Sequence, residues 1–179
     1  LGANGAGKTT LFEIVAGLRR PSAGTVQVSG IDVVASPQQA KQKLAYIPER
    51  PVLYPELSAL ENLNLFAQLW GVNRDSIQER AESLLRQVDL WSVRHRWVEA
   101  YSTGMKKKLS LCAALIHDPT VLLMDEPFSG LDIEAGWWAR DMLRSFAHDG
   151  GCVVFTSHTP ELVSAFAERI VILLDGRIV

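Results

Sequence analysis

The sequence predicts an α/β fold built on a mostly parallel sheet, and three observations lead to this prediction. Short, nearly continuous apolar runs at Thr120–Glu126 and Cys152–His158 are typical of strands buried on both faces of a sheet. Segments with helical periodicity alternate with these runs, as crossover helices do. Alternating residues at Gly24–Gly30 and Ile170–Val179 predict hairpin strands at an antiparallel edge.

Six segments show helical periodicity, several of them with start or stop signals. Gly17 and Pro21 mark the end of the first segment, and Asn73 is suited to cap the third. We therefore expect helices at Lys8–Leu18, Leu60–Trp70, Asn73–Leu90, Ser102–His117, Ile133–His148 and Pro160–Glu168.

Residues 51–101 contain predicted helices but no clear strand, so they interrupt the α/β pattern. We expect one domain, residues 1–179, in which residues 1–50 and 102–179 form the α/β core and 51–101 form an inserted helical subdomain. A chain of 179 residues, 47% of them hydrophobic, suffices for one sizeable core. It starts at Leu1 rather than Met, just before a glycine-rich loop, which predicts a fragment that lacks its first strand.

Composition also restricts the class of protein. A formal net charge of −2 gives no overall positive field for holding nucleic-acid phosphates, so no nucleic-acid partner is expected. Cys112 and Cys152 lie in apolar runs without metal-ligand spacing, which favours two reduced thiols in the core and a reducing compartment. No apolar run approaches the roughly 20 residues that span a bilayer.

The segment Gly2–Thr10, GANGAGKTT, fits the phosphate-binding pattern G-x-x-x-x-G-K-[ST]. Glycines in such a loop let backbone N–H groups surround a polyphosphate, and the helix that follows directs its positive end at the anion. Lys8 would reach the β- and γ-phosphates, and the Thr9 hydroxyl would bind Mg²⁺. We therefore expect the polyphosphate of a nucleotide to bind at Gly2, Ala3, Asn4, Gly5, Ala6, Gly7, Lys8, Thr9 and Thr10.

Acidic residues at the end of a buried strand are the expected counterpart of this loop. Asp125 follows Val121–Met124 and is placed to bind the Mg²⁺ shell, while Glu126 is placed to polarise the attacking water. His158 ends the next apolar strand, where a sheet of this kind carries its ligand-side loops. Hydrolysis, and not only binding, is therefore predicted.

The motifs GANGAGKTT, YIPE, YSTGMKKKL, VLLMDEP, SGLD and TSH, in this order, resemble the nucleotide-binding subunit of ATP-binding cassette (ABC) transporters over essentially the whole chain. The resemblance implies a P-loop NTPase core of the RecA-like type and a Mg²⁺-dependent ATPase that works as a head-to-tail homo- or heterodimer. It places Glu49 at the family's Q-loop glutamine, Asp132 in its D-loop and His158 at its switch histidine. Glu49 is thus expected near the catalytic centre and as a Mg²⁺ ligand.

The same resemblance places Ser102, Thr103 and Gly104 at the family's Leu-Ser-Gly-Gly-Gln signature, which contacts ATP bound to the partner subunit. Here the segment reads Tyr-Ser-Thr-Gly-Met, so Thr103 brings a side chain where the family has glycine. Ser102 is suited to cap the helix that follows, and Lys106–Lys108 fan over about 200° of it, so they cannot all face one anion. We expect phosphate binding across a dimer, with Asp132 part of the same trans site.

The family also implies a separate membrane permease, with Glu49–Leu57 as the candidate docking surface at the cytoplasmic face of the cell membrane. The alternative is a soluble ABC-superfamily ATPase acting on ribosomes or in DNA repair. Such proteins would add a second cassette, long coiled coils or zinc-ligating cysteines, and none of these accessories is present in the sequence. A fragment can lack such accessories, so the full-length reading frame and its gene neighbours would distinguish the transport function implied by the resemblance from this alternative.

Overall fold

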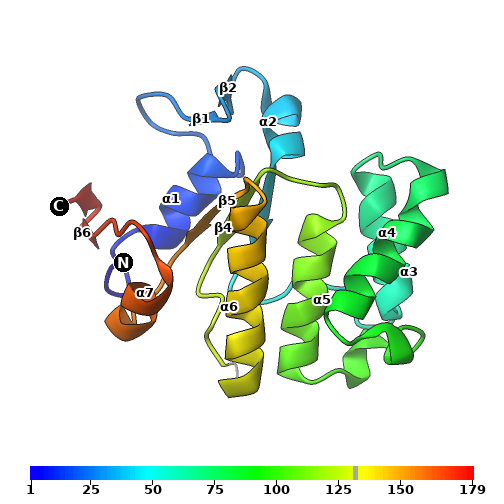
Figure 1. Cartoon of the computed structure of the whole chain (residues 1–179). Coiled ribbons are helices and arrows are strands. Elements are labelled where there is room, and N and C mark those ends of the chain that lie inside the picture. Colours follow the sequence, from blue (N-terminus) through cyan, green and yellow to red (C-terminus); the bar gives the residue numbers. More distant parts are fainter. Residues whose placement is uncertain (131–132) are drawn as a thin grey trace. The chain divides into compact units, whose positions relative to one another are not determined.

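The chain divides into two units, which are described separately. The structure, a computed structural model, describes residues 1–130 and 133–179 (Figure 1). Residues 1–49, 120–129 and 140–179 form the first, here named the α/β unit, and residues 50–119 and 130–139 form the second, here named the helical unit. Helix α6, Ile133–His148, contains residues of both.

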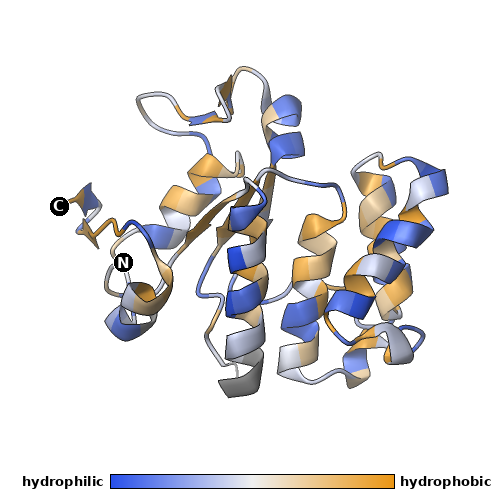
Figure 2. Cartoon of the chain, viewed as in Figure 1, coloured by the Kyte–Doolittle hydropathy of each residue, from blue (hydrophilic) through white to orange (hydrophobic). Residues whose placement is uncertain are grey.

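Three parallel strands form the sheet of the α/β unit. Strands β3 (Leu44–Ile47), β4 (Val121–Met124) and β5 (Cys152–Phe155) lie in the order β3-β4-β5. Val121 pairs with Leu44 on one side and Cys152 on the other, so the carboxyl ends of all three strands lie together. The predicted parallel sheet is confirmed, and Figure 2 shows its strands as hydrophobic.

Strand β5 is less buried than the sequence suggested. Cys152 is exposed and Val154 is 41% exposed, whereas β4 is buried along most of its length. Exposed and half-buried residues alternate along β5, so one face of this strand is covered less than the other, and within the described sheet β5 has a partner strand on one side only. The prediction of two core cysteines is therefore right for Cys112 and wrong for Cys152.

Helix α1 (Lys8–Val15) packs against this sheet through Phe12, whose ring lies edge-on to Tyr46 at 6.4 Å. The expected hairpins are present and antiparallel, each as a two-stranded sheet of its own. The remaining elements of the unit are β1 (Gln27–Val28), β2 (Ile31–Asp32), α2 (Pro37–Lys43), α7 (Pro160–Phe166), β6 (Leu173–Leu174) and β7 (Arg177–Ile178).

The helical unit is built on α3 (Ala59–Leu69), α4 (Arg74–Gln87) and α5 (Thr103–Leu115), with short 3-10 helices at Trp91–Val93 and Val98–Ala100. Helix α5 packs on both α3 and α4 and belongs to the helical unit. The sequence pattern instead predicts a helical insertion that ends at residue 101, with this helix in the α/β core. Figure 2 shows that the second half of α5 is its hydrophobic part. Fully buried side chains at the centre include Leu63, Leu85, Leu109 and Ile116.

Polar side chains fix the helix starts of this unit. Ser58 and Glu61 form a capping box at α3, and Asn73 accepts a hydrogen bond from Asp75 N–H at α4, as predicted. Asn62 is fully buried, and its amide bonds to backbone groups of Tyr54, Leu57 and Ser58. These bonds hold the chain that leads into α3.

Candidate nucleotide-binding site

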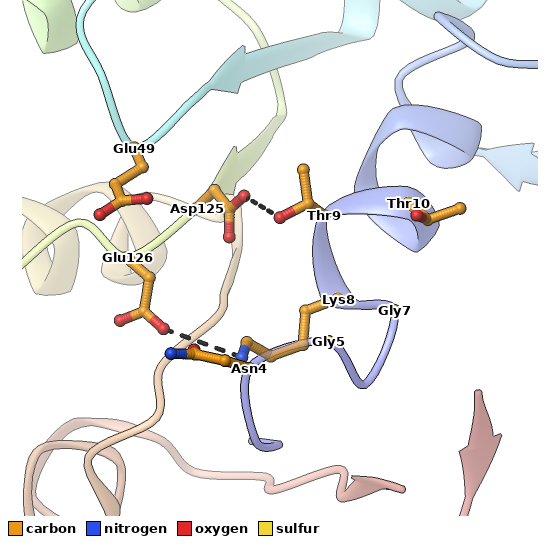
Figure 3. Close-up of a pocket in the computed structure, with 9 residues that line it drawn as sticks. All are labelled: Asn4, Gly5, Gly7, Lys8, Thr9, Thr10, Glu49, Asp125 and Glu126. Carbon is orange, nitrogen blue, oxygen red and sulfur yellow. Dashed lines mark hydrogen bonds and ion pairs between the residues drawn. The ribbon is translucent and has the colours of Figure 1, made fainter. Parts of the chain in front are cut away.

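One pocket of the α/β unit gathers most of the predicted site residues (Figure 3). Its volume is about 250 Å³, and three segments contribute to it: the glycine-rich loop with the start of α1, the end of β3, and the end of β4. The lining residues are Asn4, Gly5, Gly7, Lys8, Thr9, Thr10, Glu49, Asp125 and Glu126. Gly2, Ala3 and Ala6 belong to the loop without lining the pocket.

The backbone conformation of the loop favours glycine. Gly5 has φ 83° and Gly7 has φ 98°, in the left-handed region that other residues rarely adopt. Gly7 is the residue before α1, and its carbonyl accepts from Leu11 N–H. The first N–H groups of a helix have no partner within the helix, so the loop ends beside a set of donors suited to an anion.

The ammonium group of Lys8 is held inside the site. Its Nζ donates to the carbonyl oxygens of Gly2 at 2.7 Å and Ala3 at 3.1 Å. The same Nζ lies 4.0 Å from Glu126 Oε1, and both side chains are largely buried, with exposed fractions of 10% and 13%. The predicted phosphate ligand and the predicted base are therefore paired in this structure.

Asp125 is buried and hydrogen-bonded through both carboxylate oxygens. Thr9 Oγ1 donates to Asp125 Oδ2 at 2.6 Å, and Thr156 Oγ1 donates to Asp125 Oδ1 at 2.5 Å. The two residues predicted to bind Mg²⁺, Thr9 and Asp125, thus lie in direct contact. Thr156 was not singled out from the sequence, although it stands two residues before His158 at the end of the same strand.

Glu126 has contacts on both its backbone and its carboxylate. Its φ is 48°, its N–H donates to Thr156 Oγ1 at 3.0 Å, and His158 Nδ1 lies 2.9 Å from its Oε1. The structure therefore brings His158 to Glu126, although His158 does not itself line the pocket.

Glu49 follows β3 and directs its carboxylate to the same pocket as Asp125 and Glu126 (Figure 3). Three carboxylates and one ammonium group, that of Lys8, therefore line the cavity. A polyphosphate entering alone would meet an excess of negative charge, and a divalent cation would relieve it.

The donors present suit Mg²⁺, which prefers oxygen ligands and is usually held by one or two carboxylates together with substrate phosphates. Thr9, Asp125 and Glu49 offer such oxygens. Within the described residues no three His, Cys, Asp or Glu side chains are grouped so that they could hold a metal ion by themselves. Phosphate and water oxygens would supply the other ligands of a bound Mg²⁺.

The predicted trans-site residues lie elsewhere in the chain. Ser102 precedes α5 and caps it by accepting from Met105 N–H at 3.2 Å, while Thr103 and Gly104 are its first residues. Asp132 lies outside the described residues. Lys106 Nζ donates to Glu99 O, and Lys108 Nζ lies 5.0 Å above the Trp138 ring, so these two lysines have contacts within the helical unit.

A phosphate-binding loop that leads into a helix, with a strand-end carboxylate bonded to the loop's threonine, defines a P-loop protein that binds and hydrolyses nucleotides. Residues 1–129 match the family model described as ABC transporter, so the chain belongs to that family. The resemblance inferred from the motifs is confirmed, and with it ATP binding and ATPase activity.

Two relatives and one solved structure illustrate the match. The chain is 36% identical over 180 residues to the ABC transporter ATP-binding protein NatA of Bacillus subtilis, covering all of this chain and 73% of that protein. It is 37% identical over 179 residues to the daunorubicin resistance ATP-binding protein DrrA3 of Streptomyces coeruleorubidus, covering all of this chain but only 57% of that protein. A structure described as the ATP-binding subunit of an ABC transporter superposes with a TM-score of 0.90 at 31% identity, covering 99% of this chain and 74% of that one.

Among the helices that the structure describes, none is long and apolar enough to cross a membrane.

Proposed function

We propose that the pocket of the α/β unit binds ATP together with Mg²⁺ and that Glu126 activates the water for hydrolysis. The observation that carries this proposal is the direct bonding of Thr9 to Asp125 beside the Lys8–Glu126 pair. Binding groups and a base therefore share one pocket.

Each side chain has a role that follows from its contacts. Lys8 offers its charge to the β- and γ-phosphates, and Thr9 and Asp125 hold Mg²⁺. The ion, when bound, neutralises charge on the phosphate oxygens. Glu49 supplies a further oxygen at the metal side of the pocket, where the family resemblance places a glutamine.

Glu126 accepts a proton from the attacking water as the water oxygen bonds to the γ-phosphorus. The bond from that phosphorus to the bridging oxygen breaks, and ADP and phosphate result. His158 Nδ1, 2.9 Å from Glu126 Oε1, orients the carboxylate. The catalytic set is therefore Glu126, His158 and Glu49.

A second cassette completes the site in this proposal. Ser102, Thr103 and Gly104 at the start of α5 contact the phosphates of ATP bound to a partner subunit, as a helix N-terminus can do. Asp132 belongs to the same trans site. The partner is a second copy of this chain or a related subunit.

The work done with ATP is transport through a separate membrane permease, a function that the names of the relatives support. Residues Glu49–Leu57 form the docking surface, and Val52 and Tyr54, which are 67% and 46% exposed, offer it apolar contacts. The chain then acts as a peripheral protein at the cytoplasmic face of the membrane. The alternative of a soluble ATPase on ribosomes or in DNA repair has no support among these relatives.

The test compares Lys8→Ala with Lys43→Ala, an exposed lysine at the end of α2, in the full-length protein. Loss of a charge-assisted phosphate contact should weaken ATP binding about tenfold to a hundredfold for Lys8→Ala, because such contacts contribute about 1.5–3 kcal/mol. Lys43→Ala should bind like the wild type. Calorimetry with ATP and Mg²⁺ measures both, and equal affinities would contradict the assignment of the pocket.

A further inference from the structure

Thr156 connects the two acidic residues of the site through a single hydroxyl group. It is 4% exposed and directly follows β5, and its N–H donates to Met124 O at 2.9 Å, continuing the ladder between β4 and β5. Its Oγ1 donates to Asp125 Oδ1 and accepts from Glu126 N–H at 3.0 Å. The sheet thus fixes the threonine, and the threonine contacts both acidic residues.

The first of these contacts determines how the Asp125 carboxylate is turned. Thr9 bonds one oxygen and Thr156 the other, so rotation of the carboxylate would break at least one bond to a hydroxyl. Without Thr156, the Asp125 carboxylate would keep, of its two hydrogen bonds to hydroxyls of the described residues, the one from Thr9.

The second contact determines the backbone at Glu126. A φ of 48° lies in the left-handed region, which residues with a side chain disfavour. The hydroxyl of Thr156 accepts the Glu126 N–H in this conformation, and His158, two residues further along the chain, contacts the Glu126 carboxylate. The segment after β5 therefore holds Glu126 at its backbone and at its side chain.

We propose that Thr156 is a positioning residue for ATP hydrolysis, whose hydroxyl sets Asp125 for the metal and Glu126 for the water at the same time. This inference rests on the roles proposed above for those two residues. The alternative is a purely structural role, in which the hydroxyl of Thr156 only has its hydrogen bonds satisfied in the interior. Loss of the hydroxyl would then change the stability of the fold, whereas loss of a positioning residue would change kcat and the Mg²⁺ dependence.

The experiment uses the full-length protein and the variants Thr156→Val, which keeps the shape and loses the hydroxyl, and Thr156→Ser, which keeps the hydroxyl. The matched control is Thr120→Val, because Thr120 Oγ1 donates to Lys43 O at the opposite end of the same sheet. For each variant, kcat, KM for ATP, the Mg²⁺ concentration at half-maximal rate, ATP affinity in excess EDTA and the melting temperature are measured.

Thr156→Val should lower kcat about tenfold to a hundredfold, the range expected when a hydrogen bond to a charged group is lost. The half-maximal Mg²⁺ concentration should rise several-fold, while ATP affinity in EDTA stays within about twofold. Thr156→Ser should restore kcat to within about threefold of the wild type, and Thr120→Val should match the wild type.

A wild-type kcat and Mg²⁺ dependence in Thr156→Val would overturn the inference. So would a loss of activity that Thr156→Ser shares and that follows the melting temperature. If the valine variant does not fold, Thr156→Ala is judged by the same measurements. Glu126→Gln is measured in parallel: retained hydrolysis there contradicts the proposed role of Glu126, whereas failure of the Thr156 variants alone leaves that role standing.

Discussion

Asp125 in the α/β unit and Asn62 in the helical unit are both buried polar side chains, with exposed fractions of 6% and 0%, yet their partners differ in kind. Asn62 bonds only to backbone groups, those of residues 54–58. Asp125 bonds to two hydroxyls, one from the start of α1 and one from the segment after β5.

The partners of a buried polar group indicate its role. A neutral amide whose donors and acceptors are all used by one loop stabilises that loop and has no capacity left for a ligand. A carboxylate keeps lone pairs and a charge after accepting two hydrogen bonds. Asp125 also lines a pocket, so its carboxylate is placed where a ligand could contact it.

The largest expected effect concerns the α/β unit. Glu126→Gln should lower kcat by about 10²–10⁴-fold, because an amide keeps the shape of the side chain but cannot accept the proton. Nucleotide binding should persist, and in the full-length protein a nucleotide-trapped dimer should be visible by light scattering. Turnover at the wild-type rate would show that Glu126 is not the base.

In the helical unit, the substitution to compare with Glu126→Gln is Asn62→Ala. We expect a loss of about 2–4 kcal/mol in the free energy of unfolding, because several buried backbone groups lose their partner. ATP affinity should not change. Asn64→Ala, on the same helix at a partly exposed position, is the control and should cost less than about 0.5 kcal/mol. Denaturant titration measures the free energy of unfolding of both variants, and a loss of ATP affinity in Asn62→Ala would contradict a purely structural role for Asn62.

Glu49 should give a smaller effect that depends on the substitution. If its carboxylate is a Mg²⁺ ligand, Glu49→Gln should keep hydrolysis within about tenfold, a barrier change near 1.4 kcal/mol, because the amide oxygen still coordinates. Glu49→Ala should lose more. The measurement is the ATPase rate as a function of Mg²⁺ concentration for the wild type, Glu49→Gln and Glu49→Ala. Three superimposable curves would show that Glu49 is not a Mg²⁺ ligand.

The smallest expected effect at neutral pH is on the free energy of unfolding, and it comes from two groups that stay protonated in the folded chain. Burial raises the pKa of Cys112 in the helical unit from 9.0 to about 12, and burial with nearby Asp125 and Glu13 raises the pKa of Tyr46 in the α/β unit from 10.0 to about 12. Both groups ionise more readily when unfolded, so stability should fall as pH rises from about 9 toward 12.

The two groups serve as controls for each other, because their ordinary pKa values are 9.0 for Cys112 and 10.0 for Tyr46. Cys112→Ala should flatten the stability curve from pH 9 upward, whereas Tyr46→Phe should flatten it only above pH 10. Thermal unfolding at fixed pH steps measures both, and parallel curves for wild type and variants would contradict the prediction.

The helices and strands that were predicted well have a sequence pattern within their own residues that indicates the type of element. Strand β4 is a continuous apolar run, and α4 has a capping asparagine and an apolar stripe of which Ile77, Ala81, Leu85 and Val88 are buried. Helix α2 was missed because PQQAKQK has no apolar stripe. Strand β3 was missed although its apolar run LAYI has the same length as that of β4. The phosphate-binding loop was recognisable because its glycines and lysine lie together in sequence.

Contacts between distant segments had no such signal. Thr156 meets Asp125 and Glu126 only because β4 and β5 pair with Met124 opposite Phe155, which brings the residues after each strand together. That register is a property of the sheet and not of either segment. The exposure of β5 likewise depends on its neighbours rather than on its apolar composition.

The close approach of the C-terminal hairpin to the glycine-rich loop has a consequence for sequence variation. An added Cβ at Gly2 would lie 2.6 Å from Leu173 O, whereas one at Gly5 would meet nothing within 4 Å. Leu173 N–H also donates to Leu1 O, and Gly176 N–H to Ala6 O, so the hairpin cannot easily withdraw. In a library selected only for folded protein, without ATP, Gly2 would already be restricted, while Gly5 would still admit asparagine and aspartate, which tolerate its φ. Invariance of Gly2 would then be explained by the fold, whereas invariance of Gly5 would indicate a requirement of nucleotide binding.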